Sequence, residues 1–371
     1  MLRAPGTSPG SNATRCRSPS WPSAVRGLAG AVAVAAVCLG AQPNSTVERL
    51  LTQRMGFSTS DVRALERGSA VVNTLDTPVR EEVAHVGVVY LDAPAEQFIE
   101  RFRDIERFER GPGIPQIGRF SGAPRIEDLR SLSLPAADVA DLPECRPGDC
   151  EVKLPAEAFD HFRDGVDWTS AEAVGQANKV AREMILNLVR AYRAGGNAAL
   201  GTYGNGDGRS PEAVAFRGLL ANGDPLPAPI PALLAYLDDY PRGRPRGAED
   251  FFYWTVVEFG LKPTIRVNHV TIHSLADRPS TGVAYAIAIK QLYASHYFHT
   301  TLELRFLVDR MAPSGRLGAA LISITRSRND GMTGFRGWFL RPIIRRRSRD
   351  GVRDYLEHVR GQVERADPAV P

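Results

Sequence analysis

The last third of the sequence contains ionisable residues that could act as acids or bases. His269 and His273 lie four positions apart, Glu303 and Arg305 alternate in a later run, and Tyr285 falls between the two runs. Such groups transfer protons when the fold places them in a pocket. They therefore make a cyclase- or hydrolase-type enzyme one hypothesis. The alternatives are surface or hydrogen-bonded core histidines, and cross-strand charge pairing of Glu303 and Arg305.

The histidine spacing argues against a metal site. Each residue of a strand advances about 3.3 Å, so His269 and His273 would share a face at a separation of about 13 Å. His296 and His299 would point to opposite faces of their strand. The glycine-rich run at 203–208 lacks the acidic ligands of a calcium loop, and the short motifs of nucleophile elbows, phosphate loops and zinc proteases are absent. We expect no metal and no other cofactor, and we assign no catalytic residue.

Two of the four cysteines are spaced for a local disulfide. Cys145 and Cys150 flank Arg-Pro-Gly-Asp, in which Pro-Gly predicts a turn that brings the two sulfurs together. In an oxidising compartment they would close a small loop and contribute about 1–2 kcal/mol. The alternatives are two free thiols, a redox-active pair, or half of a metal site, against which the sequence offers no second Cys/His pair with ligand spacing.

Residues 1–41 have the composition of a signal peptide or membrane anchor. Leu28–Gly40 is an uncharged small-and-aliphatic run that follows a stretch rich in Ser, Pro and Arg. Thirteen residues are short for a membrane span and suit a signal peptide cut after Ala41. We predict export to the periplasm or the medium, or membrane anchoring if the leader is not cleaved.

The formal net charge of +4 comes from this leader, which holds four arginines and no acidic residue. The rest of the chain has 42 basic and 42 acidic residues, so its charge predicts no nucleic-acid partner, and a membrane contact only through an uncleaved leader. An arginine cluster near the C-terminus is interpreted as a solvated helix face, with anionic headgroups or a partner as the alternative. The cluster is Arg341, Arg345, Arg346, Arg347 and Arg349.

The elements that must position these residues begin with two short helices, Ser45–Met55 and Ser60–Arg67. A strand at Val79–Leu91 precedes an amphipathic helix whose apolar stripe is Phe98, Ile99, Phe102, Ile105 and Phe108. Residues 111–250 are rich in turns and contain a helix opened by a capping box at Thr169–Glu172, with Val174 as the first residue of its buried stripe.

From Phe251 the pattern changes to period two, which predicts an antiparallel meander. The five runs are Phe252–Phe259, Thr264–His273, Val283–Tyr293, Tyr297–Val308 and Ala319–Arg326. A final helix is expected over Pro342–Glu364, with an arginine-rich face opposite its buried stripe. Strict alternation places Phe298 with the apolar residues of its run, and Val283 on the same face as Ile287. The side chains that could line a ligand cavity, or equally fill a plain core, are Tyr285, Ile287, Phe298, Leu302, Leu304 and Phe306.

These elements predict the α+β class, with a curved antiparallel sheet that grips a long C-terminal helix. The predicted segments are the leader at 1–41, the first core elements at 42–110, a mostly helical and loop insertion at 111–250, and the meander with its final helix at 251–371.

The order of elements resembles the START-like helix-grip proteins, which include polyketide cyclases and lipid-transfer domains. The resemblance is carried by Val83–Phe108, the meander at 251–326, and the tail from Gly334 to Glu364, with the insertion at 111–250 as a departure from the family. It implies an apolar cavity between the sheet and the closing helix. The first hypothesis is therefore an exported binder of a hydrophobic small molecule or lipid. The rivals are the enzyme described above and an envelope interaction protein, and the oligomeric state stays open.

Overall fold

The computed structural model describes residues 47–111, 113–202, 211–221, 230–275, 282–312, 314–330 and 334–365, with the backbone alone at 334–340. The predicted leader and the glycine-rich run at 203–208 lie outside these residues. The helices are η1 (Leu50–Arg54), α2 (Thr59–Glu66), α3 (Ala95–Arg103), α4 (Ile105–Glu109), η2 (Ile126–Leu129), α5 (Ala136–Asp141), η3 (Leu142–Glu144), α6 (Ala156–Gly165), α7 (Ala173–Gly195), η4 (Gly196–Ala199), α8 (Glu212–Ala221), α9 (Pro231–Asp239) and α10 (Gly334–Glu364). The strands are β1 (Val71–Leu75), β2 (Glu82–Leu91), β3 (Gln116–Arg119), β4 (Ala248–Val257), β5 (Thr264–Ser274), β6 (Val283–Ala294), β7 (Phe298–Met311) and β8 (Leu317–Asn329).

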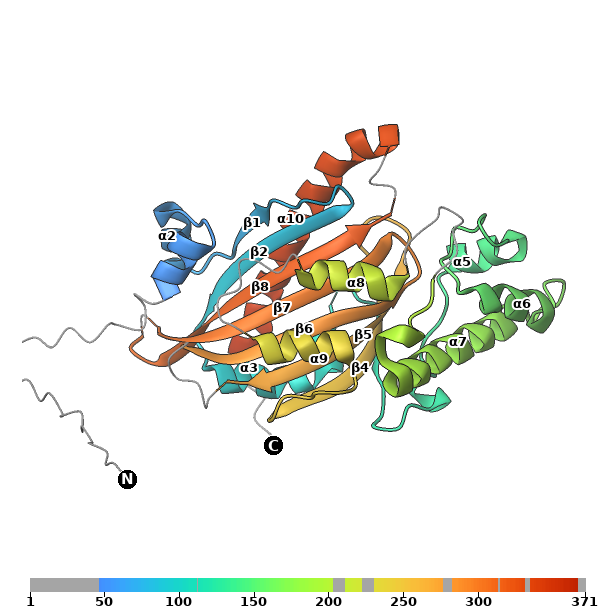
Figure 1. Cartoon of the computed structure of the whole chain (residues 1–371), viewed down its shortest axis with the longest axis horizontal. Helices are drawn as coiled ribbons and strands as arrows, with labels where there is room; N and C mark the ends of the chain where they lie inside the picture. Colours follow the sequence, from blue (N-terminus) through green and yellow to red (C-terminus); the bar gives the residue numbers. More distant parts are fainter. Residues whose placement is uncertain are drawn as a thin grey trace, which may run out of the picture. The chain divides into compact units, whose positions relative to one another are not determined.

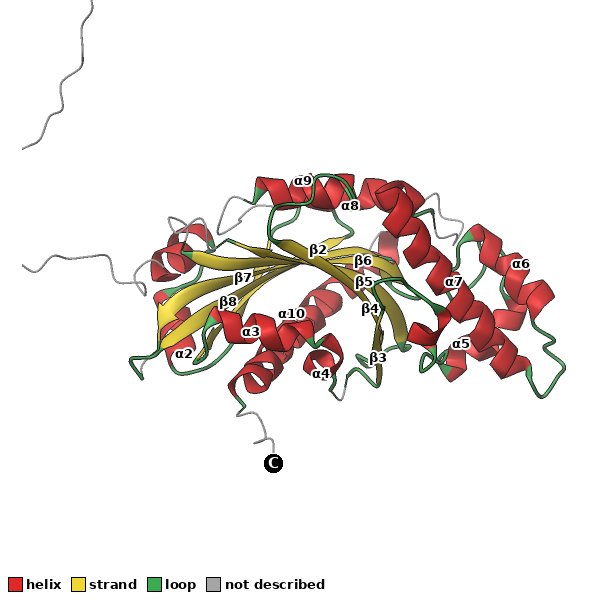
Figure 2. Cartoon of the chain, turned by 90° about the horizontal axis from the view of Figure 1, so that it is seen from below, coloured by secondary structure: helices red, strands yellow, loops and turns green. Residues whose placement is uncertain are grey.

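The strands of the described residues form one open antiparallel sheet in the order β1-β2-β8-β7-β6-β5-β4-β3 (Figure 1). Strands β4 to β8 are neighbours in both sequence and space, which confirms the predicted meander. Strand β2 returns to pair with β8 along its whole length. The sheet is curved and helices cover both of its faces (Figure 2), so the α+β class and the C-terminal helix packed on the sheet are confirmed.

We call the face on which α10 packs the gripped face; it carries Val89, Ile287, Leu307 and Leu321. Helices α3 and α4 share this face with α10 (Figure 2). The predicted single helix at this point divides at Asp104, whose side chain accepts from the backbone of Arg107 and begins α4. The predicted stripe is nevertheless buried throughout, so both short helices cover one end of the gripped face.

The opposite, outer face carries Leu302, Leu304, Phe306 and Ile322. Helices η1, α8 and α9 cover it, and α7 packs against the β4–β6 end (Figure 2). The segment at 111–250 therefore does more than form a separate insertion, because it supplies the edge strand β3 and the helices of the outer layer. Helix α6 and Leu142 of η3 form a satellite core with the first turns of α7.

A glycine allows α10 to cross β2 closely. A Cβ atom at Gly87 would lie 2.6 Å from Leu356 Cδ1 and 3.0 Å from Val352 Cγ1. The helix begins at Gly334, eight residues before the predicted start, and contains Pro342. Among the described helices, none combines the length and apolar character that a membrane crossing requires.

Two β-bulges overturn predictions made from strict alternation. A register shift beside His299 places Phe298 opposite Asn329 on the gripped face, whereas Leu302 and the following apolar residues of β7 lie on the outer face. A second shift separates Val283 from Ile287 in the same way. Each bulge inserts one residue, and one residue reverses the direction of every side chain beyond it.

The start of α7 also differs from its prediction. The helix begins at Ala173, and Glu172 precedes it without a side-chain cap. The Thr169 hydroxyl donates to Asp167 instead of capping the helix. Val174 is consequently 53% exposed, while the stripe from Ala177 onward is buried.

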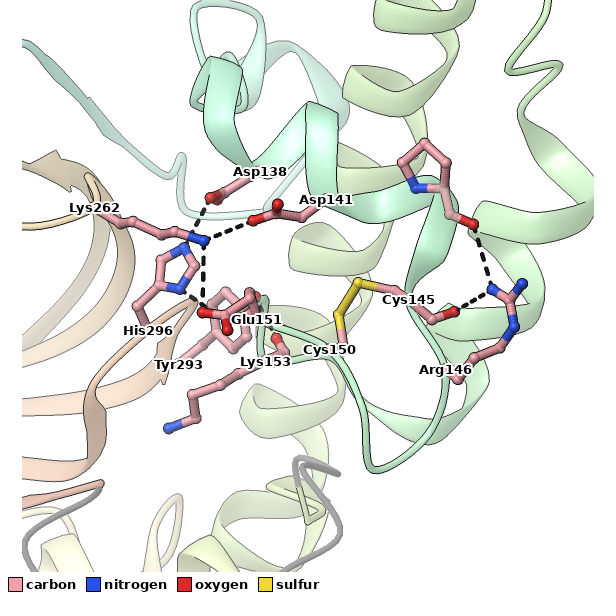
Figure 3. Close-up of a disulfide and its surroundings, with 11 residues drawn as sticks. Asp138, Asp141, Cys145, Arg146, Cys150, Glu151, Lys153, Lys262, Tyr293 and His296 are labelled. Atoms are coloured by element: carbon pink, nitrogen blue, oxygen red, sulfur yellow. Dashed lines mark hydrogen bonds and ion pairs between the residues drawn. A yellow bond between two sulfur atoms is a disulfide. The ribbon is translucent and has the colours of Figure 1, made fainter. Parts of the chain in front are cut away.

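The predicted disulfide is present between Cys145 and Cys150 (Figure 3). The chain beyond it lies along the β6–β7 hairpin, where His296 Nδ1 donates to the carbonyl of Glu151 at 3.0 Å and Nε2 meets Asp138 at 2.8 Å. The bond thus lies next to a buried anchor that joins the satellite core to the sheet.

We expect replacement of both cysteines by serine to lower the free energy of unfolding by about 2 kcal/mol, because so short a loop loses little chain entropy when closed. Urea unfolding measures this value, and limited proteolysis should show faster cleavage near residue 147 alone. A loss above about 4 kcal/mol, or faster cleavage throughout the chain, would contradict a local role.

Candidate functional site

The gripped face divides into an apolar half and a polar half. Near α3 the strands present Leu91, Ile272 and Leu307, which pack into the apolar cluster. Farther along the same strands, the side chains on this face become polar, although most of them are buried. The cross-strand register places ten of them together, and we call this set the polar half: His85, Thr255, Arg266, Asn268, Gln291, Thr301, Glu303, Arg305, Ser323 and Thr325.

Arg305 joins the buried carboxyl group of Glu109 and the partly buried one of Glu303 at the border between the halves. Its Nε and Nη2 atoms donate to the two oxygens of Glu303 at 2.7 and 3.2 Å, and Nη2 lies 3.7 Å from Glu109 on α4. Ser323 donates to Glu303 at 2.8 Å, and the Tyr355 hydroxyl of α10 donates to Glu109 at 2.5 Å. The sheet, α4 and α10 therefore meet at one ionic cluster.

The two carboxyl groups of this cluster respond differently to their surroundings. Burial raises the pKa of Glu109, and its contacts with Arg305 and Tyr355 offset only part of that effect. Burial would also raise the pKa of Glu303, but the charge and hydrogen bonds of Arg305, the hydrogen bond from Ser323 and the charge of Arg266 together outweigh it and leave that pKa lowered. At neutral pH Glu303 is thus ionised, while Glu109 is the carboxyl group more easily protonated.

Five buried side-chain atoms of the polar half have no hydrogen-bond partner among the described residues: Arg266 Nε, Asn268 Oδ1, Gln291 Oε1, Thr301 Oγ1 and Arg305 Nη1. They lie on three adjacent strands, with Asn268 directly opposite Gln291 and Thr301 at the next position of the ladder. Buried polar atoms in folded proteins are nearly always paired with protein, ordered water or a ligand. These atoms therefore call for hydrogen-bond partners that the described residues do not supply.

Helix α10 meets the polar half at His85, whose Nε2 lies 2.5 Å from Ser348 Oγ and whose Nδ1 lies 3.2 Å from Thr74 Oγ1. Burial, together with the charges of Arg345 and Arg349, lowers the pKa of His85 to about 4. The imidazole is therefore neutral at pH 7, and the positive charge at this end belongs to the arginines of α10.

The arginine cluster divides between two environments, which corrects its interpretation as one solvated face. Arg341, Arg345 and Arg349 are spaced by one helical turn, and each has a buried Nε atom without a partner in the part of the chain that the structure describes. Arg346 and Arg347 are exposed. The first three side chains thus lie on a partly covered side of α10, which is where His85 contacts the helix.

The six predicted ligand-binding residues do not surround one space. Leu302, Leu304 and Phe306 pack beneath α8 and α9 on the outer face. On the gripped face, Tyr285 and Ile287 pack in the apolar half, where Ile287 is fully buried. Ile287 lies directly opposite Arg305 at the border of the two halves. Phe298 borders the polar half at its other end, where the Arg266 guanidinium is 5.4 Å from its ring centre.

Of the predicted acid–base residues, His269 lies in a second buried network, on the outer side of the sheet. Its Nε2 is 3.0 Å from Asp250 Oδ1, and the Tyr192 hydroxyl is 3.1 Å from its Nδ1. Burial lowers the pKa of His269 despite the nearby Asp250, so the neutral ring donates to the carboxylate and accepts from Tyr192. The Tyr240 ring stacks on the Tyr192 ring, with the ring centres 4.7 Å apart, and completes the network. We interpret the network as a structural part of the core.

Lys290 extends this network and is one of the largest fully buried side chains. Its amine donates to Asn197 and lies 3.8 Å from the ring centre of Phe216. Burial lowers the pKa of Lys290 to about 7, with weak opposing effects of Asp238 and Glu212. The amine therefore loses much of its charge near neutral pH.

The other three histidines considered in the sequence analysis make contacts elsewhere in the fold. His273 is buried on the outer face opposite Ala248, and His299 lies 3.4 Å from Glu212 of α8. His296 anchors the satellite core through Asp138 (Figure 3). Within the described ranges, no three side chains of the His, Cys, Asp or Glu type are grouped to hold a metal ion.

Sequence reasoning identified Glu303 but missed its most informative neighbours. Asn268 and Gln291 are uncharged and belong to no recognisable motif in β5 and β6. The available signal was their spacing: Arg266 and Asn268 are two apart, and so are Thr301 and Glu303, which places each pair on one face of its strand.

The sequence matches no protein-family model, and a search of the curated proteins finds no relative. The curved antiparallel sheet with α10 on one face is compatible with a helix-grip fold. The function is therefore inferred from the geometry of the polar half.

Proposed function

We propose that the chain is an exported, START-like protein that binds a small molecule in the polar half of the gripped face. The observation that carries the proposal is the set of five buried atoms on β5, β6 and β7 that lack partners among the described residues. Leaving such an atom unpaired costs about 1–3 kcal/mol. A guest with a polar group would remove that cost, whereas a purely apolar guest would not.

The rest of the guest would contact aromatic side chains at the edge of this site. Phe298 is half-buried there, and Phe259, which is 38% exposed, packs against it with ring centres 5.8 Å apart. We therefore expect an amphipathic ligand, whose polar group enters the polar half and whose apolar part lies against these rings.

Export is supported by the leader sequence and by the disulfide. Protein disulfides persist in oxidising compartments and are rare in the reducing cytosol. Cys145 and Cys150 are bonded, and residues 1–41 have the composition of a signal peptide. N-terminal sequencing of the protein recovered from its native host would locate the cut, which we expect after Ala41.

The binding proposal predicts that the purified protein carries a small molecule that native mass spectrometry detects and denaturation releases. Replacement of Gln291 by leucine should abolish this adduct, because an apolar side chain of similar volume removes the hydrogen-bonding amide from the site. The matched control is Gln53→Leu on η1, where the side chain is exposed. Co-purification of the same adduct with both variants, or of none with the wild type after ligand-retaining purification, would reject the proposal.

Catalysis is a second candidate function, favoured by the opposite pKa shifts of Glu109 and Glu303 beside one guanidinium. Paired carboxyl groups of this kind divide the roles of general acid and general base. If the site transforms its guest, Glu109→Gln should accumulate a substrate of different mass from the product bound by the wild type. Identical ligand masses in the wild type, Glu109→Gln and Glu303→Gln would leave binding alone.

A further inference from the structure

We propose that the polar half recognises an anionic group, either a carboxylate or a phosphate ester. This inference rests on the proposed function and adds the charge of the ligand to it. Its starting point is the chemistry of the atoms that lack partners, since each kind of atom restricts what the guest can offer.

The arginine atoms of the site require an acceptor. Arg266 Nε and Arg305 Nη1 on the sheet, and the Nε atoms of Arg345 and Arg349 on α10, are buried without partners among the described residues. A guanidinium N–H group donates hydrogen bonds and never accepts them. A guest that pairs with any of these nitrogen atoms must therefore bring an acceptor, such as an oxygen atom.

The other partnerless atoms are compatible with the same guest. A threonine hydroxyl such as that of Thr301 rotates to donate. The amides of Asn268 and Gln291 present NH₂ groups in place of their oxygens when turned by 180°, a change that leaves the shape of the side chain unaltered. Thr301, Asn268 and Gln291 can thus donate hydrogen bonds to the guest, and the arginines can only donate.

The charges of the site also favour an anion. Arg305 and Glu303 compensate each other through two hydrogen bonds. Arg266 is within salt-bridge distance of no carboxylate in the described part of the chain, and its guanidinium rests on the Phe298 ring. A carboxylate or phosphate beside Arg266 would form a charge-assisted hydrogen bond with its Nε atom, which has no partner among the described residues.

A cationic guest has no comparable place. It would need the carboxylate of Glu303, but Oε1 already accepts from Arg305 Nε and from Ser323, at 2.7 and 2.8 Å, and Oε2 accepts from Arg305 Nη2. An ammonium group would also lie beside the guanidinium of Arg305, which costs energy in a buried site.

The test uses four probes with one ten-carbon chain: decanoate, decyl phosphate, decanol and decyltrimethylammonium, each below its micelle concentration. Inorganic phosphate and acetate form a second arm that separates a soluble anion from an amphiphile. Binding to the full mature chain, delipidated by a mild organic wash, is measured by isothermal titration calorimetry. The variant is Arg266→Gln, and its matched control is Arg347→Gln on the exposed side of α10.

We expect at least one anionic probe to bind ten times more tightly than decanol, and Arg266→Gln to lose at least tenfold of that affinity while Arg347→Gln retains it. Equal affinity for phosphate and decyl phosphate would identify a soluble anion and still support the proposal. If decanol or the ammonium probe binds as tightly as the anions, and Gln291→Leu loses that affinity, the inference of an anionic ligand is wrong. The proposed binding site would still be supported. No binding of any probe by a wild type that also lacks a co-purified ligand would overturn both.

Discussion

Replacement of Arg305 by methionine is expected to lower the free energy of unfolding by about 3 kcal/mol at pH 7.5, because it leaves the largely buried carboxylate of Glu303 without the guanidinium that pairs with it. Arg305 is 2% exposed and holds Glu303 through two nitrogen atoms. Methionine retains an unbranched apolar stem against the rings of Phe102 and Tyr355, so the variant removes charge more than packing.

The loss should depend on pH in a defined direction. In the wild type the pKa of Glu303 is lowered, so its pairing stabilises the fold above the unfolded pKa, near 4.5, and this contribution disappears as the pH falls. In Arg305→Met we expect the pKa of Glu303 to rise above its value in the unfolded chain. The unpaired carboxylate then destabilises the fold while it is ionised, and this destabilisation vanishes near pH 4. Both effects make the difference between the proteins smaller in acid.

Urea unfolding of both proteins at pH 7.5 and pH 4 measures this difference. The control is Arg305→Met combined with Glu303→Gln, which removes the unpaired charge and should recover more than half of the loss at pH 7.5. An equal deficit at both pH values, or no recovery in the double variant, would show that Arg305 acts through packing alone.

Replacement of Lys290 by methionine is expected to raise the free energy of unfolding by on the order of 3 kcal/mol at pH 6. Burial lowers the pKa of Lys290 from 10.5 to about 7, and each unit of such a shift corresponds to about 1.4 kcal/mol. The lost hydrogen bond to Asn197 offsets about 1 kcal/mol of the gain.

The sign of the pH dependence follows from the direction of the shift. Between pH 7 and 10.5 the unfolded chain binds a proton at Lys290 that the folded chain lacks, so wild-type stability should rise by up to about 1.4 kcal/mol per pH unit. Below pH 7 both states are protonated and the folded protein bears the full cost of a buried charge. The gain in Lys290→Met should therefore be largest at pH 6 and small at pH 10.

Lys179→Met provides the control, because Lys179 is an exposed lysine on α7. Its stability relative to the wild type should be the same at pH 6 and pH 10 within a few tenths of a kcal/mol. If Lys290→Met is less stable than the wild type at pH 6, then the buried amine stabilises the fold and its low pKa is not a cost of burial.

The meander was predictable because apolar and polar residues alternate along its strands and turn residues separate them. The bulge at His299 was not predictable, because one additional residue in a strand leaves no recognisable mark on the local sequence. That residue moved Phe298 to the gripped face, away from Leu302 and Phe306. The local sequence therefore indicates that side chains alternate along a strand more reliably than it indicates the face on which each one lies.

The identity of the gripped face was harder to predict for a different reason. Polar residues such as Thr301, Glu303 and Arg305 on alternate positions usually indicate a face exposed to water. Here the apolar side of β7 lies under α8 and α9, whose segments have the turn-rich composition of 111–250. The polar side is consequently the one that shares its face with α10, and this arrangement depends on contacts between residues far apart in sequence.

A crystal structure of the protein purified without added ligand, at a resolution that separates water from larger groups, would test directly whether the polar half binds a small molecule. We expect electron density for a bound molecule that contacts Arg305 Nη1, Thr301 Oγ1 and Gln291 on the gripped face. Side chains of the protein filling that place and pairing these atoms with one another would contradict it.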